Sequence, residues 1–164
     1  NEAGLSRGII SLHFQSKEKL LLETLVHVVD EYKVLWERAL KKAGDSGAER
    51  LAALVEVDFH PSVCDRNKLA VWFAFWSETR ARPTYRKLCA NRDKEYDRML
   101  LQLCTDIAGE GSYEAIDPEA AASGLAELYE GLWLDMLVNP RRMTSKKSLK
   151  ISMAYLSQLF PDHF

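Results

Sequence analysis

The fold is decided by residues 3–20, which read AGLSRGIISLHFQSKEKL. Within them, Gly4 and Ser6 predict a tight turn and then a helix, because glycine tolerates turn conformations and serine caps helices by accepting a backbone N–H. This short helix is expected over residues 7–14, and Ser16 caps a new helix that begins at the next residue. A turn, a short helix and a restarted helix in this order are typical of a helix-turn-helix, whose second helix enters the DNA major groove.

The short helix has an apolar side and a polar side. Ile9 and Ile10 form the apolar side, while small or hydrogen-bonding residues face outward, namely Arg7, Gly8, Ser11 and His13. A complete motif requires a scaffold helix before this segment, and residues 1–3 offer room only for the end of one. The chain is therefore expected to be a fragment at this end. The alternative is a surface helical hairpin with no role in DNA binding.

Composition restricts the class of protein. The 164 residues carry a net charge of −2 and include no apolar run near the ~20 residues that a membrane span requires. This charge argues against coating of DNA by bulk electrostatics, but it fits a small reading head on a larger body. The three cysteines, Cys64, Cys89 and Cys104, form no C-x-x-C pair and are expected to be reduced thiols in a cytoplasm. We favour buried small hydrophobes over a redox switch.

Apolar residues recur at helical spacing along the rest of the chain, and no alternating pattern predicts a strand. The predicted fold class is therefore all-α. Residues 1–16 would be the remnant of the DNA-binding domain, 17–43 a connecting helix, and 44–164 a ligand-binding and dimerisation domain. Caps, prolines and glycines divide that last domain into predicted helices over residues 48–60, 66–82, 84–108, 118–138 and 145–160.

The last two predicted helices have the composition of an oligomer interface. Gly124 and Gly131 lower helix propensity, and close approach of a neighbouring backbone explains both. Packing with symmetry mates would give a four-helix bundle and a two-fold dimer. The predicted interface residues are Ala121, Gly124, Leu128, Gly131, Ile151 and Tyr155. The alternative is that both glycines serve packing within one chain.

Aromatic residues at helical spacing predict a ligand site in the body. Trp72 and Trp76 lie four residues apart, as do Tyr129 and Trp133, so each pair shares a helix face. Aromatic rings beside a carboxylate suit an organic cation, because the ring quadrupole attracts positive charge. The candidate ligand-binding residues are Asp58, Trp72, Trp76, Tyr96, Tyr129 and Trp133. The alternative is that these aromatic residues form an ordinary core.

These features together resemble the TetR family of repressors, and in particular its choline-responsive members that control betaine synthesis. The resemblance spans the chain and is carried by Gly8-Ile9-Ile10, Trp72 with Phe75-Trp76, Gly124-Leu125-Ala126 and Gly131-Leu132-Trp133-Leu134. It implies a dimeric repressor with a ligand pocket in a helical body and release from DNA when ligand binds. It also implies base reading by Arg7, Gly8 and Ser11, and phosphate contacts by Ser6, His13 and Lys17.

The sequence therefore predicts a non-enzymatic homodimer that binds a palindromic double-stranded DNA operator. A small molecule, such as choline or a related quaternary ammonium compound, is expected to release it. No cofactor and no membrane association are expected. No metal is expected either, since Asp58, His60 and Cys64 share no helical register and lack a fourth ligand. One alternative is a helical ligand-binding protein or enzyme that does not regulate DNA; another is the same architecture with a non-cationic inducer.

Overall fold

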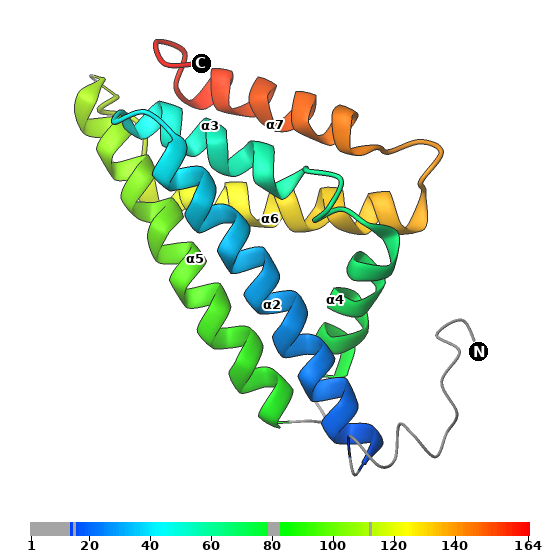
Figure 1. Cartoon of the computed structure of the whole chain (residues 1–164). Coiled ribbons are helices and arrows are strands. Elements are labelled where there is room, and N and C mark those ends of the chain that lie inside the picture. The colour runs from blue at the N-terminus through cyan, green and yellow to red at the C-terminus, as the bar shows by residue number, and fades with distance from the viewer. Residues whose placement is uncertain (1–13, 15, 79–82, 112) are drawn as a thin grey trace.

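The computed structural model describes residues 14, 16–78, 83–111 and 113–164 (Figure 1). Over these residues the chain is helical and contains no strand, which confirms the predicted all-α class. In the same residues, no helix combines the length and the apolar character needed to cross a membrane. The helices are α2 (Lys17–Lys42), α3 (Gly47–Asp58), α4 (Arg66–Glu78), α5 (Pro83–Glu110), α6 (Pro118–Val138) and α7 (Ser145–Leu159).

The predicted helix boundaries agree with the observed ones to within about two residues, with one informative difference at Pro83. The sequence predicts that this proline ends the preceding helix, whereas in the structure it is the first residue of α5. Proline is suited to that position because the first turn of a helix needs no N–H donor. The predicted end of α4 at Arg82 lies outside the described residues.

Side chains cap the helices, at Ser16 as the sequence predicts and at Ser46 in addition. Ser16 accepts a hydrogen bond from the backbone N–H of Lys19 at 3.1 Å, which fixes the start of α2. Ser46 and Glu49 form a reciprocal capping box at the start of α3, with the Glu49 N–H donating to Ser46 Oγ at 3.2 Å. These caps satisfy N–H groups that the helix itself leaves without partners.

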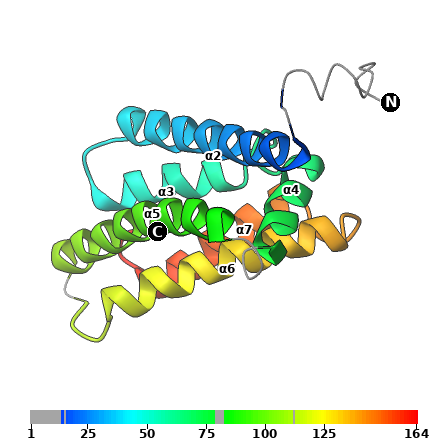
Figure 2. The same cartoon turned by 90° about the horizontal axis from the view of Figure 1, so that it is seen from below.

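Helix α6 lies across the centre of the body. Figure 1 shows α3, α6 and α7 stacked together, with α2 and α5 running obliquely from them toward the N-terminal end of α2. Figure 2, seen from below, shows α3 lying between α2 and the layer of α6 and α7. The core fills the space between these helices with fully buried leucines, including Leu51, Leu54, Leu100, Leu125 and Leu156. The same packing brings the middle of α2 and of α5 against the end of α3.

We expect the substitution Ser46→Ala to lower the free energy of unfolding by about 1 kcal/mol, because it removes the N-terminal cap of α3. Chemical denaturation followed by circular dichroism measures this change. Glu56→Ala, at an exposed position on the same helix, is the matched control and should stay within ~0.5 kcal/mol of the wild type. Equal effects of the two substitutions would contradict a capping role for Ser46.

Candidate ligand-binding site

A buried carboxylate, Asp58, lies at the last position of α3 and has no solvent exposure. Both of its oxygens accept hydrogen bonds from phenol groups: Tyr32 of α2 donates to Oδ1 and Tyr96 of α5 donates to Oδ2. A buried charge requires such partners, because an unpaired carboxylate in an apolar interior is strongly unfavourable. Three helices are therefore joined at one side chain.

The backbone carbonyl of Asp58 is held as well. It accepts a hydrogen bond from the indole Nε1–H of Trp133 at 2.9 Å and another from the thiol of Cys64 at 3.1 Å. The last carbonyls of a helix have no partner inside the helix, so these donors complete the end of α3. The bond from Trp133 also fixes the orientation of its ring beside the carboxylate.

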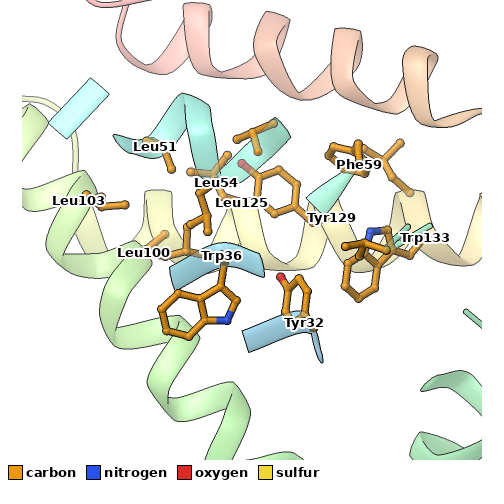
Figure 3. Close-up of a cluster of buried hydrophobic side chains, with 14 of the residues drawn as sticks. Tyr32, Trp36, Leu51, Leu54, Phe59, Leu100, Leu103, Leu125, Tyr129 and Trp133 are labelled. Atoms are coloured by element: carbon orange, nitrogen blue, oxygen red, sulfur yellow. The ribbon is translucent and has the colours of Figure 1, made fainter. Parts of the chain in front are cut away.

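Aromatic rings and carboxylates line a cavity next to Asp58. The space inside it that a water-sized molecule can occupy is only about 40 Å³, and its walls come from Tyr32, Asp58, Tyr96, Asp97, Ala126, Tyr129, Glu130 and Trp133. The Tyr32 ring meets Trp133 edge to face with centroids 5.7 Å apart, and its centroid lies 6.0 Å from that of Tyr96. Figure 3 shows Tyr32 on α2 pointing toward Tyr129 and Trp133 on α6. The site is thus a cavity lined by aromatic rings, with the buried carboxylate of Asp58 in its wall.

The phenol groups at this site are held in the neutral form. Burial, followed by the charge of Asp58, raises the pKa of Tyr96 well above its usual value, and the same two causes raise the pKa of Tyr129. Tyr129 is 3% exposed, and its hydroxyl has no hydrogen-bond partner among the residues that the structure describes. In Figure 3 this hydroxyl points away from Tyr32 and Trp133, so Tyr129 presents its ring to the cavity.

The structure brings together four of the six predicted ligand-binding residues: Asp58, Tyr96, Tyr129 and Trp133 all line the cavity. Trp72 packs behind it, edge to face against Tyr32 with ring centroids 6.4 Å apart. Trp76 lies one step further out, against Trp72 and Phe73, and does not line the cavity.

Tyr32 is not among the predicted ligand-binding residues, although it contacts most of them. Its spacing on α2 matches the core-facing positions, so the sequence marks it only as part of an apolar stripe. Asp97, Ala126 and Glu130 also line the cavity, and none of them is among the predicted ligand-binding residues.

The predicted interface residues fall into two groups. Gly131 is exposed, and a Cβ built on it would meet no atom within 4 Å; Tyr155 on α7 is 38% exposed. Leu128 and Ile151 are half-buried. Ala121 is buried inside the chain, and a Cβ on Gly124 would lie 3.3 Å from the Tyr155 hydroxyl of the same chain. Packing within one chain therefore accounts for the small residue at Gly124, whereas nothing in the described chain accounts for Gly131.

The predicted DNA-contacting residues Ser6, Arg7, Gly8, Ser11 and His13 lie outside the described residues. Lys17 is described, and it is the exposed first residue of α2. The predicted phosphate contact at Lys17 would therefore come from the end of α2 that adjoins the short helix of the motif.

Comparison with known proteins places this chain in a family. Residues 47–161 match the family model described as BetI-type transcriptional repressor, C-terminal. The HTH-type transcriptional regulator BetI of Pseudomonas paraeruginosa (strain DSM 24068 / PA7) is 35% identical over 157 residues, which cover 95% of this chain and 77% of that protein. BetI of Burkholderia mallei (strain NCTC 10229) is 32% identical over 157 residues, covering 96% of this chain and 78% of that protein.

The chain belongs to the BetI-type branch of the TetR family. It is a transcriptional regulator of this type, and solved structures share its fold. A transcriptional regulator from Pseudomonas aeruginosa PAO1 superposes with a TM-score of 0.82 at 29% identity, covering 98% of this chain and 77% of that one. A regulator from Saccharomonospora viridis superposes with a TM-score of 0.83 at 23% identity, covering 95% and 81% of the two chains.

The two described thiols of this BetI-type regulator are poorly reactive groups. Burial raises the pKa of Cys64 to about 12 and that of Cys104 to about 11. A raised thiol pKa leaves little thiolate at neutral pH, and thiolate is the form that reacts. Within the described residues, no group of three His, Cys, Asp or Glu side chains is placed to hold a metal ion.

In a Cys89→Ser variant, we expect the two remaining thiols to react with a maleimide at neutral pH at least about a hundredfold more slowly than in the denatured chain. The rate should rise as the pH approaches the raised pKa values. Stopped-flow alkylation with mass spectrometry measures both rates. Comparable rates in the folded and denatured chains would revive the redox-switch interpretation.

Proposed function

We propose that this chain is a dimeric repressor that leaves a palindromic operator when choline, or a related quaternary ammonium compound, enters the cavity at Asp58. The observation that carries the proposal is a fully buried carboxylate, enclosed by aromatic rings, whose two oxygens already accept hydrogen bonds from Tyr32 and Tyr96. A site of this kind offers negative charge together with ring faces. In the cell, such a regulator would work in the cytoplasm, beside the DNA.

The hydrogen bonds to Asp58 favour a quaternary over a primary ammonium group. A quaternary ammonium ion has no N–H to donate, so a carboxylate that depended on the ligand for hydrogen bonds would be left without donors after burial. In this site the protein supplies the donors itself, and the bond from Tyr96 would still satisfy the carboxylate where a ligand displaced Tyr32. The ligand then needs to bring only charge and methyl groups, which match the carboxylate and the rings of Tyr129 and Trp133.

The likeness to the Saccharomonospora viridis regulator adds support, since that protein was solved in complex with choline. The fold is shared, and the binding of choline by the present chain remains our proposal. A non-cationic inducer would be less well matched to a cavity with the carboxylates of Asp58, Asp97 and Glu130 in its walls.

Release from DNA would follow from a shift between two dimer geometries. Helix α2 begins at Lys17, next to the predicted reading helix, and passes the cavity at Tyr32. A ligand that binds better to the geometry in which the two reading helices miss their half-sites will favour that geometry. The ligand shifts this equilibrium only by the difference between its affinities for the two states.

We expect choline to release the full-length protein from DNA taken from upstream of its own gene, and 3,3-dimethylbutan-1-ol to be at least about tenfold less effective. This alcohol has the shape of choline with carbon in place of the charged nitrogen, so the comparison isolates the charge. Fluorescence anisotropy of labelled DNA measures release. Equal potency of the two compounds would contradict recognition of a cation.

Asp58→Asn should raise the choline concentration needed for release by more than about tenfold, because it removes the buried counter-charge while keeping one acceptor oxygen. If choline still released this variant at the wild-type concentration, the site would lie elsewhere. A protein with no specific DNA binding would instead support the alternative of a helical enzyme or carrier.

The dimer would form through the outer faces of α6 and α7. Leu134 is 44% exposed, Val138 is 59% exposed, and both lie on the same side of α6 as the open position Gly131. Tyr155 extends this apolar surface onto α7. A second copy packed on this surface would bury it and place two reading helices about a two-fold axis, which matches a palindrome.

Leu134→Glu should shift the protein from dimer to monomer in sedimentation-velocity experiments and weaken operator binding, because it places a charge on the proposed interface. Val34→Glu is the matched control, since Val34 is 40% exposed on α2. The control should stay dimeric. Loss of the dimer in both variants, or in neither, would contradict an interface on α6.

A further inference from the structure

Three consecutive residues of α2 attach it to three different neighbours. The outer two do so through ion pairs near the surface: Glu31 pairs with Lys68 of α4 at 2.7 Å, and Lys33 pairs with Glu95 of α5 at 2.7 Å. Solvent screens charges at such positions, so these pairs hold α2 only weakly.

The middle residue, Tyr32, makes the buried attachment. Its hydroxyl donates a hydrogen bond to the buried carboxylate of Asp58. A hydrogen bond to a charged group in the interior is stronger than an ion pair that solvent screens, so this is the strongest of the three attachments. Tyr32 is also the residue of α2 that lines the proposed ligand cavity. The contact that holds α2 against the end of α3 is therefore part of the cavity wall.

The cavity rings stand too close together to hold a ligand between them. The ring centroid of Tyr32 is 5.7 Å from that of Trp133 and 6.0 Å from that of Tyr96. Tyr32 meets Trp133 edge to face, so at this separation the edge of one ring already contacts the face of the other and leaves no room for a methyl group between them. The Trp133 ring is fixed by its hydrogen bond to the Asp58 carbonyl at 2.9 Å. A ligand that separates the Tyr32 and Trp133 rings therefore displaces Tyr32.

We propose that Tyr32 is the residue that couples ligand binding to DNA binding: a cation entering between Tyr32 and Trp133 breaks the bond from Tyr32 to Asp58 and frees α2 to move. This inference rests on the proposed function of the same site. Lys17 lies about 22 Å along α2 from Tyr32, so a small rotation at Tyr32 becomes a larger displacement beside the reading helix. Tyr32 is a positioning residue, because it acts on DNA binding through α2.

The test compares the full-length wild type with Tyr32→Phe, which keeps the ring and removes the hydroxyl. Without choline, we expect Tyr32→Phe to bind the upstream DNA about tenfold more weakly, because the geometry that binds DNA has lost its buried attachment. At saturating choline, the variant and the wild type should bind that DNA equally weakly, since the bond is broken in both. The factor by which choline weakens binding therefore falls about tenfold.

Two comparisons separate coupling from general damage. Glu95→Gln breaks the neighbouring attachment between α2 and α5 outside the cavity, and it should leave the choline response at the wild-type value. Tyr96→Phe removes the other phenol donor to Asp58, but from α5, so it should alter choline affinity and keep the coupling factor. Because coupling is reciprocal, choline titrations with and without DNA must give the same factor.

A wild-type coupling factor in Tyr32→Phe would overturn this inference. So would equal weakening of DNA binding with and without choline, since that is the mark of a damaged fold. A wild type that choline does not release would instead overturn the proposed function, and the inference with it, before any variant is compared.

Discussion

The arrangement of this body depends on one buried charge at the end of a helix. Asp58 ends α3, where the carbonyl groups of the last turn already give the helix a negative pole. A carboxylate is unfavourable there unless donors surround it, and the chain supplies donors to Asp58 from three other helices and from the segment that follows α3. Tyr32 and Tyr96 reach the carboxylate, while Trp133 and Cys64 reach the backbone carbonyl. Helices α2, α5 and α6 therefore meet at a point set by hydrogen-bond satisfaction as well as by apolar packing.

The same arrangement makes the site suitable for a switch. A purely apolar core at this point would be more uniformly packed, but it would hold no charge to attract a cation. The ring of Tyr32 on α2 lies against those of Tyr96 on α5 and Trp133 on α6, so a ligand that separates these rings acts on side chains of more than one helix. Helices α2 and α5 are each attached to Asp58 by one phenol, and α2 is the one that leads toward the predicted reading head.

Helix α6 contributes residues to both proposed functions of the body, ligand binding and dimerisation. Tyr129, Glu130 and Trp133 turn toward the cavity, whereas Gly131 and Leu134 lie on the exposed side. One helix thus contributes a wall of the ligand site and the centre of the proposed dimer face. The helix begins at Pro118, after the cap Asp117, and ends before Asn139. Because both faces belong to one helix, their residues keep a fixed register with respect to each other.

The sequence by itself determined the helical class, the helix boundaries to within about two residues, and four of the eight residues that line the cavity. Capping residues and periodicity act locally, which is why the sequence predicts the observed ends of α6 and the observed cap of α2 at Ser16. Aromatic spacing likewise identified Tyr129 and Trp133, because a helix repeats its own geometry. Tertiary structure decided what spacing cannot express. It joined Tyr32 to Asp58 across 26 positions of sequence, moved Trp76 out of the cavity lining and turned Gly124 toward Tyr155 of the same chain. Those outcomes depend on how helices pack against one another, and a core-facing tyrosine shows its partner only when the neighbouring helix is in place.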